Sequence, residues 1–169
     1  MSAMERSQQD IFEKNLYDIT SLEDEIRADL LCDRLLKACG LHLMEHHRLS
    51  AEEASRLCYG ASYFLREYLI PDRRVNLFEL QPRHIRQFAG NWYIVKNLEP
   101  NLTELTGMLE GVLAFHSYCH SLGLVSGQQA ETIQASCADL DYYQSRIESF
   151  FAIENDGYFQ WLADCPLDD

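Results

Sequence analysis

Apolar residues recur at helical spacing along most of the chain. After Ser50, for example, the inward positions of one segment are three or four residues apart: Ala54, Leu57, Cys58, Ala61, Phe64, Leu65 and Tyr68. Side chains at that spacing share one face of an α-helix, whereas a half-buried strand alternates at every second residue. No alternating run in the chain is long enough to predict a strand. The sequence therefore predicts an all-α fold, a compact multi-helix bundle.

Capping residues mark where the first helices begin. Ser21 precedes a segment in which Ile26, Leu30 and Leu35 recur at helical spacing, and acidic residues fill its first turn. That helix ends at Gly40 or continues to about residue 47. Ser50 begins the next helix, with Glu53 placed three residues later as in a capping box. A short amphipathic segment is also expected over residues 8–19.

Prolines and glycines divide the rest of the chain. Pro71 is expected to end the second helix, and Pro82 fits the first turn of a short one. A further helix begins at Asn101 or Thr103, and Gly123 is expected to end it. The next predicted helix is long, roughly 128–153. We expect an N-terminal extension over 1–49, a central helical module over 50–126, and a C-terminal long helix with an acidic tail over 127–169.

The charge is distributed unevenly. The chain has a net charge of −13, but residues 50–125 hold 8 acidic and 7 basic residues, whereas residues 126–169 hold 9 acidic residues and one arginine. A strongly acidic protein is repelled by nucleic acids and anionic membranes at long range. A nearly neutral centre between acidic ends nevertheless favours a binding surface in the middle of the chain.

The centre resembles the N-terminal core-binding domain of tyrosine recombinases, a helical module also called SAM-like. The resemblance lies in three segments, Tyr63–Leu69 (YFLREYL), Asn76–Phe88 (NLFELQPRHIRQF) and Leu113–Val125 (LAFHSYCHSLGLV). It implies a SAM-like core at about 50–125 that contacts DNA. The chain departs from the family in two ways: the family's module is normally basic, and the 44 residues after Val125 are too few for its catalytic domain. The resemblance therefore implies DNA contact without recombination.

The candidate binding residues are the basic side chains of the centre: Arg66, Arg73, Arg74, Arg83, Arg86 and Lys96. Arginines in loops and at helix N-termini are suited to hold phosphates. The alternative is that these side chains are solvated and paired with neighbouring acids such as Glu67, Asp72 and Glu79. Six aromatic residues that recur at helical spacing are expected in the core: Phe64, Tyr68, Phe88, Trp92, Phe115 and Tyr118.

Histidines provide a second set of candidates. His42 and His46 are four residues apart if their helix continues past Gly40, and His116 and His120 are four apart on a later helix. Imidazoles at that spacing point to one side of a helix, so two such pairs on facing helices could form a four-nitrogen site, with Glu45 or Cys119 nearby. We expect no bound metal or cofactor, and the four histidines are the candidates if one is present.

Three functions are consistent with these patterns, and none is catalytic, because no nucleophile lies in a recognisable elbow or glycine-rich turn. The first is a DNA-contacting arm resembling that of the recombinases. The second is a protein-interaction or scaffold role with an acidic partner or another copy of the chain. The third is a histidine-based metal-binding bundle. The six cysteines form no CxxC pair and no apolar run is long enough to span a membrane, so we expect reduced thiols, no membrane partner and a cytoplasmic location.

Overall fold

The computed structural model describes residues 2–168, and every regular element in that range is helical, which confirms the predicted all-α class. The α-helices are α1 (Ala3–Asp10), α2 (Leu22–His46), α3 (Ala51–Ser62), α4 (Pro82–Gln87), α5 (Tyr93–Lys96), α6 (Leu102–Ser121), α7 (Gly127–Cys137), α8 (Leu140–Phe151) and α9 (Tyr158–Ala163). Short 3₁₀ turns lie at η1 (Lys14–Tyr17) and η3 (Leu77–Glu79), and π-helical stretches at η2 (Tyr63–Arg73) and η4 (Phe88–Trp92). None of the described helices is long and apolar enough to span a membrane.

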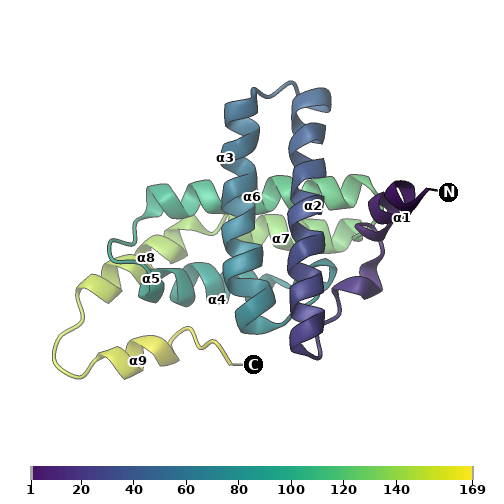
Figure 1. Ribbon diagram of the computed structural model, residues 1–169. Coiled ribbons are helices and arrows are strands. Elements are labelled where there is room, and N and C mark those ends of the chain that lie inside the picture. Colours follow the sequence, from purple (N-terminus) through teal and green to yellow (C-terminus); the bar gives the residue numbers. More distant parts are fainter. Residues whose placement is uncertain (1, 169) are drawn as a thin grey trace.

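Helices α2 and α3 form an upright antiparallel hairpin, and α6 crosses behind it (Figure 1). The Ser21 hydroxyl accepts from Asp24 N at the start of α2, and Ser50 forms the predicted capping box with Glu53 at the start of α3. Of the two ends expected for α2, Gly40 is wrong: the helix continues through Gly40 to His46. Between the two helices Arg48 has a positive φ of 56°, which allows the tight turn.

The hairpin is fixed to α6 where two helices meet backbone to backbone. Gly60 of α3 lies against Met108, and Gly111 of α6 lies against Leu57 and Ala61. Only residues without a Cβ allow so close an approach. The core then spreads to either side, and the six aromatic residues expected inside, Phe64, Tyr68, Phe88, Trp92, Phe115 and Tyr118, are all buried.

Two helices continue directly into π-helical stretches. Helix α3 continues into η2, which includes Pro71 and ends at Arg73. Helix α4 begins with Pro82 at its first turn, as predicted, and continues into η4. The wider π turns bring Phe64 and Phe88 edge to face at 5.0 Å between ring centroids, in the centre of the aromatic core.

The structure corrects two predicted helices. The single helix expected over 128–153 is two helices, α7 and α8, because Asp139 leaves the helical conformation with φ −77° and ψ 50°. The Tyr143 hydroxyl donates to Ser136 O across the break at 2.6 Å. The segment expected over 8–19 is instead the end of α1 followed by η1. Asn101, rather than Thr103, caps α6, and Gly123 ends it with φ 72°, as predicted.

The C-terminal segment folds back onto the bundle. Trp161 of α9 is buried, and the Arg146 guanidinium stacks on its ring at 3.9 Å. Arg146 Nε also donates to Gly90 O at 2.8 Å and its Nη2 donates to Trp161 O at 2.7 Å. The only basic residue of the acidic C-terminal segment is therefore buried on α8, where it joins this helix to both η4 and α9.

Candidate functional site

Arg66, the first of the predicted basic residues, is fully engaged within the molecule. Its guanidinium donates twice to the Asp29 carboxylate, at 2.8 and 3.0 Å, and once to Asp33 at 3.0 Å. These two aspartates belong to α2. The hydrogen bonds to Asp29, together with the negative charges of both aspartates, raise the pKa of Arg66 above its already high value. Its partners are therefore not the neighbouring acids expected from the sequence, and Arg66 joins η2 to α2.

The other basic residues are spread over several elements. Arg74 pairs with Glu25 at 3.5 Å, and Arg86 pairs with Asp139 at 3.5 Å while stacking on Tyr142. Lys96 Nζ lies 5.9 Å above the Trp92 ring.

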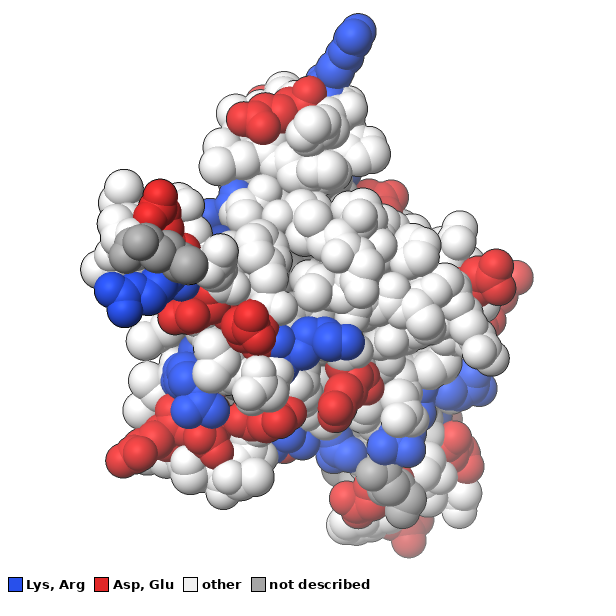
Figure 2. Space-filling view, turned by 90° about the vertical axis from the view of Figure 1, so that its right-hand side faces the viewer, with Lys and Arg blue, Asp and Glu red and all other residues white. Residues whose placement is uncertain are grey.

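The structure brings some of these residues together, but among acids. Arg83 and Arg86 line one shallow groove that also contains Asp139. Arg74 and Arg83 line another, which contains Asp18 and Glu79. Arg73 lines neither groove, and its Nε is buried with no hydrogen-bond partner among the described residues. Figure 2 shows one face of the molecule, on which blue and red side chains alternate without a broad basic area.

The histidine pairs lie in separate surroundings. The His42 and His46 rings are 4.7 Å apart on α2, and His42 packs on Tyr118 at 4.9 Å. On α6, His116 is buried and His120 Nδ1 lies 3.2 Å from Val125 O. Across residues 2–168, no three His, Cys, Asp or Glu side chains are grouped in a way that could hold a metal ion. The structure thus does not bring the four histidines together as one site.

Cys119, a further candidate ligand, is buried in the core, and burial raises its pKa to about 12. A thiol that keeps its proton is a poor metal ligand and a poor nucleophile. Glu45 is exposed on the last turn of α2.

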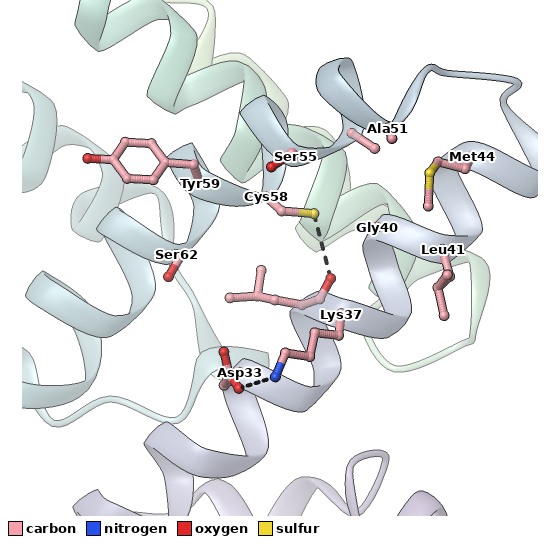
Figure 3. Close-up of a pocket in the computed structure, with 12 residues that line it drawn as sticks. Asp33, Lys37, Gly40, Leu41, Met44, Ala51, Ser55, Cys58, Tyr59 and Ser62 are labelled. Atoms are coloured by element: carbon pink, nitrogen blue, oxygen red, sulfur yellow. Dashed lines mark hydrogen bonds and ion pairs between the residues drawn. The ribbon is translucent and has the colours of Figure 1, made fainter.

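An apolar groove of about 540 Å³ lies between α2 and α3, on the side of the hairpin away from α6 (Figure 3). Leu41 and Met44 of α2 form one wall, and Ala51 and Tyr59 of α3 form the other. Leu41 and Tyr59 stand at the rims with 55% and 68% of their surface exposed, far more than core residues of this kind. Such a groove between two helices is a common place for an apolar ligand or a partner helix to bind.

A ridge of exposed apolar side chains continues the groove along the N-terminal half of α2. Leu22, Ile26 and Leu30 are each more than half exposed and follow one another at intervals of four. We define the open face of α2 as this ridge together with the groove side of the same helix: Leu22, Ile26, Leu30, Asp33, Lys37, Gly40, Leu41 and Met44. The sequence pattern included Ile26 and Leu30 without revealing that they lie off the core. The sequence did contain an indication of this face. Apolar residues occupy more of the circumference of α2 than one core-facing stripe requires, and Leu22, Ile26 and Leu30 are the additional ones.

One ion pair interrupts the open face near the middle of α2. Lys37 Nζ lies 3.0 Å from Asp33 Oδ2, and the Lys37 side chain is 74% exposed. Next to it Gly40 has no side chain, and a Cβ built there would lie 3.3 Å from Cys58 Sγ on the opposite wall. The open face therefore has the apolar ridge at one end and the groove at the other, with opposite charges between them. The missing side chain at Gly40 leaves a notch in the groove.

No family model, curated protein or solved structure matches the chain. The resemblance to the recombinase core-binding domain therefore stays a prediction.

Proposed function

We propose that the chain is a non-catalytic interaction module that self-associates through the open face of α2. The observation that carries this proposal is the exposure of five large apolar side chains on one side of the α2–α3 hairpin: Leu22, Ile26, Leu30, Leu41 and Tyr59. Exposed apolar patches on a folded protein, here one on either side of the Asp33–Lys37 ion pair, mark interaction sites. The proposed partner is a second copy, because the face is complementary to itself.

The self-complementarity follows from the order of features along α2. In a pair of antiparallel α2 helices related by a two-fold axis near residue 35, Lys37 lies opposite Asp33 of the second copy. Leu30 then lies over the notch at Gly40, and Ile26 lies over Met44. Because a two-fold interface repeats each contact, each of these pairs occurs twice. Packed helices usually cross at an angle, and the residue pairs near the two-fold axis stay in contact when they do.

The energetics support an association of measurable strength. Full burial of a leucine or isoleucine side chain contributes about 1.5–3 kcal/mol. Four such residues on α2 of each copy are 53–66% exposed, so about half of that contribution is still to be gained for each. The eight side chains of a dimer then contribute about 6–12 kcal/mol, which is comparable to the translational and rotational cost of association of about 4–15 kcal/mol. The opposed Lys37 and Asp33 set the register and orientation more than the affinity.

The experiment is sedimentation equilibrium of the full chain over a range of concentrations, for the wild type, Leu41→Glu and Leu98→Glu. Leu98 is fully exposed but lies beyond α5, away from the open face. We expect a concentration-dependent dimer for the wild type and for Leu98→Glu, and a monomer for Leu41→Glu. A wild type that is monomeric at every concentration, or equal effects of the two substitutions, would contradict the proposal.

DNA contact through the central arginines remains the alternative from the sequence. The carboxylate partners of Arg66, Arg74 and Arg86 support the interaction role instead, since a guanidinium held by a carboxylate must release it before binding a phosphate.

A further inference from the structure

Two cysteines, Cys58 and Cys39, line one small void beneath the groove. Cys58 of α3 is half-buried, and it lines both the open groove and a small void inside the core. Cys39 of α2 is buried, and it lines the same void from the other helix. Cys58 therefore stands between solvent in the groove and a second thiol behind it.

The contacts of the two thiols fix their roles. The Cys58 thiol donates to Leu36 O, with a sulfur–oxygen distance of 3.6 Å (Figure 3). The Cys39 thiol, which lines the same void, lowers the pKa of Cys58, whereas Cys58 and burial raise the pKa of Cys39. Cys58 is thus the more easily deprotonated thiol of the pair, as a nucleophile must be.

The other cysteines have no such access. Cys32, Cys119, Cys137 and Cys165 are all buried, and burial raises the pKa of the first three. Oxidation of cysteine follows thiolate character and exposure. Cys58 is therefore the one thiol among the six that a small oxidant in solvent reaches directly.

We propose that Cys58 and Cys39 form a redox-active dithiol that a peroxide converts to an intramolecular disulfide between α2 and α3. The Cys58 thiolate attacks one peroxide oxygen, the O–O bond breaks, and the leaving oxygen takes up a proton. The resulting Cys58 sulfenic acid is then attacked by the Cys39 sulfur. The S–O bond breaks and water leaves with the Cys39 proton. With hydrogen peroxide, two thiols and one oxidant give one disulfide and two waters.

This inference goes beyond the proposed self-association and does not rest on it, because the chemistry takes place within one chain. Each proposal can be contradicted without the other, because disulfide formation is measured by the mass of the chain and self-association by its sedimentation.

The test is treatment of the dilute full chain with hydrogen peroxide, followed by unfolding, alkylation of the remaining thiols and intact mass measurement. In the wild type we expect loss of two alkylatable thiols and of two hydrogens in mass, with Cys39 and Cys58 found in one linked peptide. Dithiothreitol is expected to restore all six thiols. A wild type that keeps six thiols, or that links any other pair, would overturn the proposal.

Variants distinguish the role of Cys58, which the peroxide oxidises, from that of Cys39, which attacks the sulfenic acid. In Cys39→Ala the Cys58 sulfenic acid has no second thiol to attack it, so dimedone is expected to label Cys58 at least about tenfold more than any other cysteine. Alanine is apolar and small, which suits the buried site. In Cys58→Ser neither a disulfide nor a dimedone adduct is expected, and Cys137→Ala, at a buried thiol elsewhere, is expected to behave as the wild type. Dimedone labelling of Cys39→Ala that is absent or spread over other cysteines would contradict the assignment of Cys58.

Discussion

Gly111 of α6 and Leu57 of α3 are in backbone contact, so close that a Cβ on Gly111 would lie 2.2 Å from the Leu57 carbonyl oxygen. The same Cβ would lie 2.8 Å from Ala61 N. Because the opposing atoms are backbone, they cannot move aside as a flexible side chain would. This contact fixes how the α2–α3 hairpin sits on the bundle, and with it the side of the hairpin on which the groove opens.

Gly111→Ala is expected to lower the free energy of unfolding by about 3 kcal/mol or more, the upper end for overpacking of a core. Gly107→Ala is the matched control on the same helix, where the added Cβ would meet only Arg56 Nη1 at 3.9 Å. That change is expected to stabilise the protein by up to about 1 kcal/mol through helix propensity. Urea denaturation of both variants checks the pair. Equal effects on the unfolding midpoint would show that α3 and α6 do not touch at Gly111.

Arg146→Met is expected to cost about 2–4 kcal/mol, because Gly90 O and Trp161 O lose their charged donor while both stay buried. The loss is expected first in α9, as faster amide hydrogen exchange over 158–165. Arg146→Lys keeps the charge but not the planar fork, so an intermediate effect is expected. Unchanged exchange in α9 of Arg146→Met would mean that the guanidinium does not hold this helix.

His116 is expected to make stability depend on pH. Burial lowers its pKa from 6.5 to about 4, and His120 adds to the shift in the same direction. The folded state therefore keeps the imidazole neutral, whereas the unfolded chain binds a proton below about pH 6.5. The contribution of His116 is complete above that pH and is lost as pH falls towards 4.

The loss amounts to about 2–3 kcal/mol over that window. Thermal unfolding of the wild type and of His116→Leu between pH 7 and pH 4 measures it, since the carboxyl groups titrate alike in both. The stability of the wild type relative to His116→Leu is therefore expected to fall by this amount as the pH falls. Parallel curves would indicate that His116 titrates normally in the folded protein.

Arg66→Ala is expected to lower the free energy of unfolding by about 1 kcal/mol, since the side chain joins two helices through two carboxylates. Arg56→Ala, which removes a more exposed pair with Glu110, is expected to change it by less than about 0.5 kcal/mol.

In gel-shift measurements at low salt we expect no complex of the wild type with duplex DNA. A complex that is lost in the double variant Arg73→Ala, Arg74→Ala would instead support DNA contact.

Local signals allowed much of the fold to be predicted. The caps at Ser21 and Ser50, Pro82 in a first turn, and Gly123 at a helix end act within a few residues, so the sequence carries them directly. The break at Asp139 was not predicted because neither proline nor glycine marks it. It depends instead on packing, including the Tyr143 hydrogen bond across it.

The candidate site was harder to predict because its features depend on distant residues. The partners of Arg66 are 33 and 37 positions away in the sequence, on a helix that lies beside it only in the folded protein. The groove likewise needs α2 and α3 side by side, and Cys39 and Cys58 become neighbours only there. The spacing of Leu22, Ile26 and Leu30 was visible, but an exposed stripe and a buried stripe have the same period.

The register of the proposed dimer is tested by mixing two charge variants, Lys37→Glu and Asp33→Lys. Each alone places like charges opposite each other at both ends of the two-fold contact, so each is expected to sediment as a monomer. Asp29 still holds Arg66 in the second variant, and circular dichroism confirms that both remain folded.

In an equal mixture, the introduced glutamate faces the introduced lysine and the native Asp33 faces the native Lys37. We therefore expect a one-to-one dimer to form from the two monomeric variants. Dimers of either variant alone as strong as those of the wild type, or a mixture that stays monomeric while the wild type dimerises, would contradict self-association through the open face of α2.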